Sequence, residues 1–205
     1  VTVCHVSDGN LGHVIIPPDE LTVMRAKEAE RSAQMAGFEI IHSRFDDLAI
    51  YDNNKEARDK VVDVIKSVNP DFIITHAPDD YMPDHTAVSR LVFDASFTAT
   101  LPNYHTGVPG AAKMVPIYYM DTLAGVNFQP THYVDITNQI DTKIKALECH
   151  ESQLKWMLEH DHIEFADMVR TCSKYRGYQC GVAYAEGFRP YNVYPRYSTK
   201  NLLPD

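Results

Sequence analysis

Apolar positions follow two spacings along the first half of the chain. Short, mostly apolar runs over 1–6, 38–42 and 71–75 are typical of buried strands. Between them, apolar side chains recur at helical spacing over 19–36 and 54–68, which predicts amphipathic helices. This order, β-α-β-α-β, favours an α/β fold with a parallel sheet covered by helices on both faces. Because the run 71–75 leaves no room for exposed alternation, we expect it to be a central strand.

The second half of the chain is less regular. The apolar side chains show no regular spacing after Arg189, so 190–205 is predicted to be an irregular C-terminal arm that lies on a neighbouring copy. Without a repeat or linker, 1–205 is expected to form a single domain. The other elements that we expect are a helix over 84–98, strands over 115–120, 131–136 and 182–188, a long helix from Thr137, and a helix over 163–174.

Composition excludes several classes of function. The chain has 205 residues, of which 44% are apolar and 23% charged, as in ordinary globular domains. Its formal net charge of -9 disfavours binding to nucleic acids or anionic membranes. The apolar runs are far shorter than the about 20 residues that span a bilayer, and the four cysteines form no C-x-x-C pair. We therefore expect a cytoplasmic protein that acts on a small substrate.

Polar side chains follow two of the predicted strands. Ser7-Asp8-Gly9 comes after the first, and the ten residues 76–85, with two histidines and three aspartates, come after the strand 71–75. Ligands of parallel sheets bind at the carboxyl ends of strands, so these segments are expected to share a rim. Histidine and aspartate there can hold a divalent cation. Spacing alone equally allows Asp79 and Asp84 to cap the next helix and the histidines to be solvated.

A resemblance to a known family is carried by residues 75–85, which read THAPDDYMPDH and precede an apolar helix. The segment resembles the H-P-D-H signature of the LmbE-like (PIG-L) N-deacetylases. The other matches, in the family's order, are the strand and turn Val1 to Gly9; Arg25 with Glu28 for R-x-x-E; Ile50-Tyr51-Asp52 for L-P-D; Val134 to Thr137 with Lys143, Ala146, His150, Ser152 and Gln153 for V-D-I-T…K…A…H-x-S-Q; and Tyr184 to Arg189 for Y-A-E-x-F-R.

The resemblance implies a Rossmann-like three-layer sandwich with a mostly parallel sheet. It also implies a hydrolase that removes an N-acetyl group from a small amino-sugar conjugate of the N-acetylglucosaminyl type, by attack of metal-bound water. The cofactor would be Zn²⁺ or another divalent metal, and the protein a homo-oligomer. The site residues that it implies are His85 as metal ligand, Asp84 and Tyr81 as catalytic residues, and Arg25, Asp8, Asp52 and His150 as substrate-binding residues. By spacing alone, Arg25 suits a surface ion pair better than a pocket role, and His150 suits a core position at least as well as a catalytic one.

Two departures from the family pattern qualify these expectations. The family's A-H-P-D-D-E segment, with two metal ligands and the general base, is not found in these 205 residues, so we expect the family's first βα unit to precede Val1. Met82 replaces the first histidine of H-P-D-H, and a thioether cannot donate a proton; the hydroxyl of Tyr81 can. An alternative is therefore a catalytically impaired or non-enzymatic binding protein on the same fold. A nucleotide-binding domain is disfavoured because the glycine signature is missing.

Overall fold

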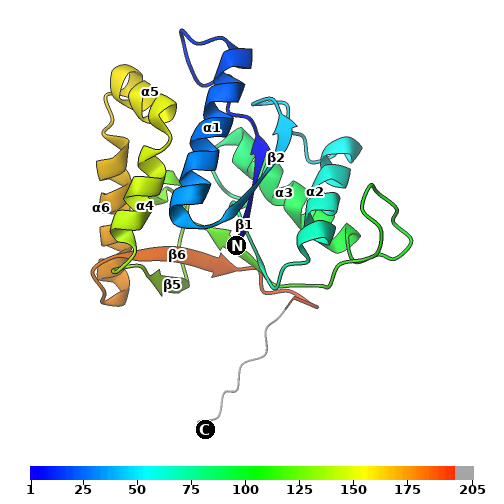
Figure 1. Ribbon diagram of the computed structural model, residues 1–205. Coiled ribbons are helices and arrows are strands. Elements are labelled where there is room, and N and C mark those ends of the chain that lie inside the picture. Colours follow the sequence, from blue (N-terminus) through cyan, green and yellow to red (C-terminus); the bar gives the residue numbers. More distant parts are fainter. Residues whose placement is uncertain (197–205) are drawn as a thin grey trace, which may run out of the picture.

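The predicted alternation of strands and helices in the first half is confirmed, with small shifts at the element ends. The computed structural model describes residues 1–196 (Figure 1). Its first elements are β1 (Thr2–Ser7), α1 (Pro18–Ala36), β2 (Glu39–Phe45), α2 (Lys55–Val68) and β3 (Ile73–Thr75). Local signals explain their ends. The Asn54 side chain caps α2 by accepting hydrogen bonds from two backbone N–H groups, and Gly37 ends α1 with a φ of 76°.

The second half contains one break that the sequence pattern did not predict. Its elements are α3 (Pro83–Thr98), β4 (Ile117–Met120), the 3₁₀ helix η1 (Leu123–Gly125), β5 (His132–Asp135), α4 (Ile140–Glu148), α5 (Glu151–Asp161), α6 (Phe165–Cys180) and β6 (Ala185–Pro190). The single long helix predicted from Thr137 is wrong. His150 leaves helical geometry, with a ψ of 58°, and a new helix begins where the buried Glu28 carboxylate accepts a hydrogen bond from Ser152 N.

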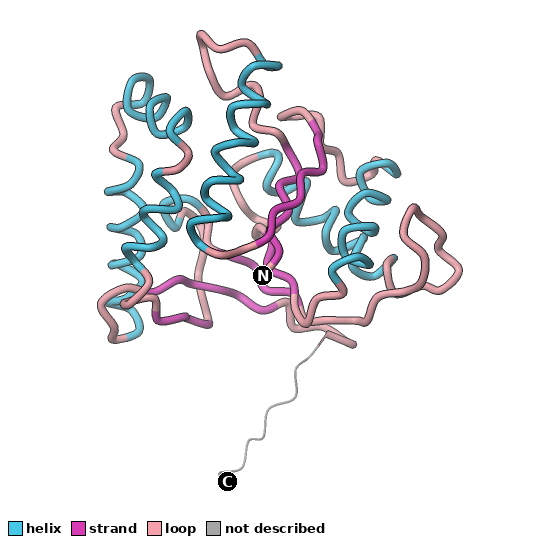
Figure 2. Tube along the Cα trace, viewed as in Figure 1, coloured by secondary structure: helices cyan, strands magenta, loops and turns pink. Residues whose placement is uncertain are grey.

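The strands form two sheets, one of two strands and one of four. β1 and β2 pair in parallel. The larger sheet has the order β3-β4-β6-β5, in which β3 and β4 are parallel and β6 runs antiparallel to both of its neighbours. The fold is therefore mixed α/β, and the expected mostly parallel sheet is confirmed only in part. The antiparallel pairs arise because the chain returns from α6 and inserts β6 between β4 and β5 (Figure 2).

The prediction that the run 71–75 is a central strand is wrong for the described residues. β3 lies at one end of the four-stranded sheet, and no described strand pairs with its outer edge. Phe72 is 54% exposed and Ile74 47% exposed. An unbroken apolar run shows that a strand is suited to burial, but it does not show which neighbour covers it.

Helices cover both sides of the β1–β2 pair (Figure 1). On one side, α2 and α3 bury the main apolar cluster, in which Val62 and Leu91 are fully buried and Val6 of β1 takes part. On the other side, α1 packs against α4, and α4 packs against α6. A smaller cluster of Ile136, Ile140 and Ile144 joins these helices to the chain after β5. None of the described helices meets the length and hydropathy needed to cross a membrane.

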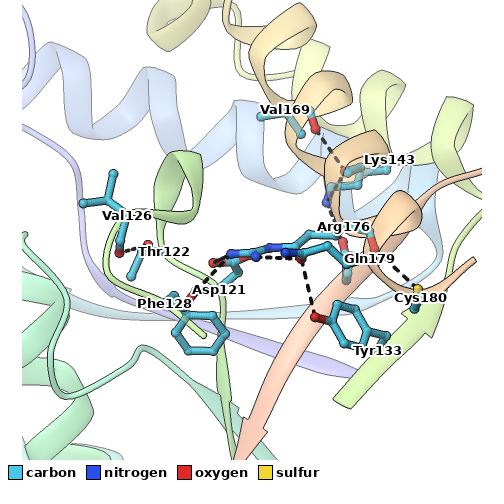
Figure 3. Close-up of polar contacts among 12 residues, drawn as sticks. Asp121, Thr122, Val126, Phe128, Tyr133, Lys143, Val169, Arg176, Gln179 and Cys180 are labelled. Carbon is cyan, nitrogen blue, oxygen red and sulfur yellow. Dashed lines mark hydrogen bonds and ion pairs between the residues drawn. The ribbon is translucent and has the colours of Figure 1, made fainter. Parts of the chain in front are cut away.

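A buried arginine joins α6 to the loop that follows β4 (Figure 3). Arg176, which is 5% exposed, donates to both carboxylate oxygens of Asp121, at 2.6 and 3.1 Å. It also donates to the Phe128 carbonyl at 3.2 Å and to Gln179 Oε1 at 2.8 Å. Such a bidentate contact has both geometric specificity and strength. The network therefore holds α6 against the four-stranded sheet.

The first part of the predicted C-terminal arm packs on its own chain. Tyr191 N donates to the Ile117 carbonyl at 2.8 Å, and the Tyr191 ring contacts the rings of Phe93 and Tyr119. Arg196 is 4% exposed and donates to the Val115 carbonyl. These residues thus pack on the protein's own sheet. The rest of the predicted arm, 197–205, lies outside the described residues.

Candidate functional site

A cavity of about 340 Å³ lies where β1 and β3 end. The two strand ends therefore share one rim, as their polar residues predicted. Side chains from both sides of the β1–β2 pair meet there. The lining residues come from β1 and its turn, α1, the loop after β2, the segment after β3, α3, α4, and α5 with its N-cap: Cys4, His5, Val6, Ser7, Asp8, Gly9, Arg25, Glu28, Ile50, His76, Asp84, His85, Val88, Leu147, His150 and Gln153.

Three ligand-type side chains gather on one wall of this region. His76 follows β3, Asp80 lies in the next turn, and His85 is in the first turns of α3. One ligand atom of each lies within 4.8 Å of the others. His85 Nδ1 is 3.0 Å from Asp80 Oδ2, and the His76 and His85 rings stack with centroids 3.9 Å apart. The sequence prediction chose His85 from this cluster and missed its partners, although the density of ligand types over 76–85 was a signal for them.

The chemistry of this cluster fits a divalent cation. Imidazole nitrogen and carboxylate oxygen are the ligands that Zn²⁺ takes in catalytic sites. Histidine binds a metal in its neutral form. Burial, helped by the neighbouring His85, lowers the pKa of His76 to about 4, so His76 is neutral at pH 7.

The other predicted catalytic residues lie in different surroundings. Asp84 lines the cavity, and its Oδ2 accepts a hydrogen bond from Leu48 N at 3.0 Å. Tyr81 is 46% exposed and lies outside the lining, as does Met82. The structure therefore brings Asp84 and His85 together and leaves the hydroxyl of Tyr81 outside the cavity. Burial is the first cause that raises the pKa of Tyr81, so its phenol stays protonated.

Arg25 and Asp8 line the cavity, and both are held by partners in the chain itself. Arg25 donates to the Gly9 carbonyl, to the Gly12 carbonyl at 3.0 Å and to Gln153 Oε1 at 2.6 Å. Gly9 has a φ of 69°, and a Cβ at this position would lie 2.7 Å from Arg25 Nη1, so glycine is required there. Asp8 pairs with Arg44 at 3.2 Å. Arg25 thus joins the turn after β1 to α5.

The remaining predicted substrate-binding residues are separated by the fold. His150 lines the cavity at the start of α5, and burial lowers its pKa. Asp52 instead lines a neighbouring hollow of about 250 Å³, where it pairs with Arg90 at 3.3 Å. The two hollows share Ile50 and Asp84. A ligand in the main cavity therefore meets His150 directly, and Asp52 only if it extends past Asp84.

Two further residues of the cavity were missed as functional candidates. His5 lies on β1, and burial, with a smaller contribution from His42 and His150, lowers its pKa to about 4. Glu28 is 2% exposed, and its two carboxylate oxygens accept hydrogen bonds from Ser152 N at 2.8 Å and Ser152 Oγ at 2.7 Å. The sequence indicated Glu28 only as part of the R-x-x-E match. Its long-range partner could not be found from local pattern.

A family model and two proteins of known name are similar to this chain in sequence. A family model described as PIG-L, GlcNAc-PI de-N-acetylase, matches residues 1–96. The chain is 29% identical over 201 residues to the diacetylchitobiose deacetylase of Thermococcus kodakarensis, which covers 90% of this chain and 69% of that protein. It is 28% identical over 203 residues to the 4-oxalmesaconate hydratase of Pseudomonas putida, covering 89% of this chain and 72% of that protein.

Solved structures match over almost the whole chain. The N,N'-diacetylchitobiose deacetylase of Pyrococcus horikoshii has a TM-score of 0.79 at 25% identity, over 95% of this chain and 75% of that one. The 4-carboxy-2-hydroxymuconate hydratase of Pseudomonas putida has a TM-score of 0.80 at 22% identity, over 98% of this chain and 87% of that one. At that identity the second likeness shows the fold alone.

Proposed function

We propose, from the match of residues 1–96 to the PIG-L family model and the likeness to a deacetylase, that this chain is a metal-dependent hydrolase that removes an N-acetyl group from a small amino-sugar conjugate. One observation carries the proposal. His85, the histidine that matches the end of the family's H-P-D-H signature, lines a cavity of about 340 Å³ beside His76 and Asp80. A volume of this size is in the range of small-molecule sites, about 300–1,000 Å³.

The residues of the chain have separate tasks in this proposal. His85 would hold the cation. Such an ion, when bound, supplies Lewis-acid activation of water and of a carbonyl oxygen. Asp84 holds the loop around Leu48 against the first turn of α3 and so keeps the helix that carries His85 in place. His150 and Gln153 offer hydrogen-bonding groups for sugar hydroxyls.

A second candidate is hydration of an unsaturated carboxylate, because one relative is named as a hydratase. Both reactions use activated water, so the fold does not separate them. The charge of the cavity supports the first. Arg25 is the one lysine or arginine among the described lining residues, beside the carboxylates of Asp8, Glu28 and Asp84. Its Nη1 and Nη2 atoms donate to three acceptors of the chain, and its Nε is buried without a partner. His5 and His76 are neutral at pH 7. The lining therefore suits an uncharged amide better than a dicarboxylate.

The experiment measures acetate release by the full-length protein loaded with Zn²⁺. The substrates are N-acetylglucosamine and N,N'-diacetylchitobiose, with an unsaturated dicarboxylate as the competing assay. We expect acetate release that His85→Ala abolishes, whereas the control His105→Ala, at an exposed loop position, keeps it. Hydration without acetate release would favour the second candidate. Protein without stoichiometric metal and without either activity would favour the non-enzymatic binding protein that Met82 suggests.

A further inference from the structure

The carboxylate of Asp80 has both oxygens occupied inside the chain. Its side chain is 2% exposed. Oδ2 lies 3.0 Å from His85 Nδ1, and Oδ1 accepts a hydrogen bond from Met82 N at 2.9 Å. The direction of the first contact depends on the tautomer of His85; with an ionised carboxylate, which only accepts, Nδ1 is the donor. Asp80 therefore determines which ring nitrogen of His85 carries the proton.

The stacked rings limit what His76 and His85 can do together. Their planes are 11° from parallel and their centroids 3.9 Å apart. The lone pair of an imidazole nitrogen lies in the plane of its ring. In two stacked, nearly parallel rings the lone pairs run side by side, so an ion in the plane of one ring lies well out of the plane of the other. The proximity of the three groups thus reflects stacking and a hydrogen bond more than three ligands that converge on one ion.

We propose that Asp80 is a positioning residue for His85. Its hydrogen bond holds His85 as the Nδ1–H tautomer and leaves Nε2 free to bind the cation, while His76 fixes the plane of the ring. Histidines that ligate a metal usually donate their other N–H to a carboxylate or carbonyl, and removal of that partner weakens metal binding by about 10–100-fold. The inference rests on the proposed function, because the ligand of Nε2 is the cation proposed above.

The affinity of the protein for Zn²⁺ gives the first test, and the neighbouring residue Asp79 provides a matched control. The full-length protein is stripped by a chelator and titrated with Zn²⁺ against a chromophoric competitor. Asp80→Asn is expected to weaken Zn²⁺ binding by about 10–100-fold. Asp79→Asn removes the same charge one residue away, from a carboxylate that pairs with Arg189 at 2.6 Å and has no contact with His85. It is expected to leave the affinity within about twofold of that of the wild type.

The tautomer of His85 gives a second test that needs no variant. In ¹⁵N-histidine NMR spectra of the metal-free wild type, His85 is expected to carry its proton on Nδ1, and in Asp80→Asn the Nε2–H form should gain population. An Nε2–H tautomer in the wild type would overturn the proposal, even if the variant does not fold. Unchanged affinity in a folded Asp80→Asn protein would also overturn it. So would a loss of more than about 1,000-fold with a changed Co²⁺ absorption spectrum, because Asp80 would then be a ligand itself.

The failure of the proposed function has a different signature. If the wild type binds no Zn²⁺ above background and still shows the Nδ1–H tautomer with Asp80, the positioning contact exists and the metal-dependent function is what fails. If the wild type binds Zn²⁺ and releases acetate but His85 is an Nε2–H tautomer, the function stands and the assignment of Asp80 is wrong.

Discussion

Replacement of Glu28 tests how the two helices that flank the cavity are held together. Glu28 lies on α1 and is 2% exposed, and its carboxylate accepts two hydrogen bonds from Ser152 at the start of α5. Glu28→Ala removes the acceptor and leaves both Ser152 donors buried without a partner. Glu28→Gln keeps the size of the side chain. Its carbonyl oxygen can accept from Ser152 N, and its amide can donate to the Ser152 hydroxyl oxygen.

The expected magnitudes follow from these contacts. A hydrogen bond to a charged group contributes about 1.5–3 kcal/mol, and a neutral one about 0.5–1.5 kcal/mol. Glu28→Ala, which loses two of the first kind, should lower the free energy of unfolding by about 3–6 kcal/mol. Glu28→Gln exchanges two charged bonds for two neutral ones and should lower it by about 2–3 kcal/mol. Ser152→Ala, which removes only the hydroxyl donor, should cost about 1.5–3 kcal/mol.

Urea unfolding at pH 7, with linear extrapolation to water, measures these differences. Glu30→Ala is the control, because Glu30 lies two residues away on α1 and is exposed; it should change the free energy of unfolding by less than about 0.5 kcal/mol. If Glu28→Ala also changes it by less than about 1 kcal/mol, or if Glu28→Gln is as harmful as Glu28→Ala, the hydrogen bonds do not hold α5 as we argue.

Three other expectations can be checked with the same unfolding assay. The pKa of His5 is lowered from 6.5 to about 4 in the folded chain, so protons bind preferentially to the unfolded chain. The free energy of unfolding should therefore fall as the pH is lowered from about 6.5 to about 4, by up to about 3 kcal/mol. If His5→Gln showed the same pH dependence as the wild type, this expectation would be contradicted. Arg176→Ala leaves the Asp121 carboxylate without its cation and should cost about 3–5 kcal/mol, whereas a loss below about 1 kcal/mol would show that the pair is dispensable. Gly9→Ala forces a side chain into a positive φ and against Arg25 and should cost about 1–3 kcal/mol, and a stability equal to that of the wild type would refute the claim that glycine is required.

Several elements could be predicted from the sequence because their signals are local. Apolar spacing predicts α1 and α2 and their order with β1 and β2, and Gly37 and Asn54 mark helix ends through contacts within a few residues of each. The break between α4 and α5 could not be predicted in this way. It depends on Glu28, which is 124 positions from Ser152, and helical spacing runs through the break without a visible interruption.

The candidate site, too, could be predicted only where its signals lie in consecutive residues. Segment 76–85 could be identified from its composition and from its resemblance to a family signature, since both are properties of consecutive residues. The different tasks of Asp80 and Asp84 could not, because both are aspartates near His85 in sequence. Only the turn before α3 decides that Asp80 contacts His85 Nδ1 while Asp84 accepts from Leu48 N.

The sequence by itself determined the order of most strands and helices and the stretch that carries the candidate ligands, because periodicity, caps and short motifs act over a few neighbouring residues. Tertiary structure decided where β3 lies in its sheet, where the helix after Thr137 breaks, and which of the polar residues face the cavity. Those outcomes depend on contacts between residues far apart in the chain, such as that of Arg25 with Gln153. The energies of such contacts cannot be assigned until the fold has brought the partners together.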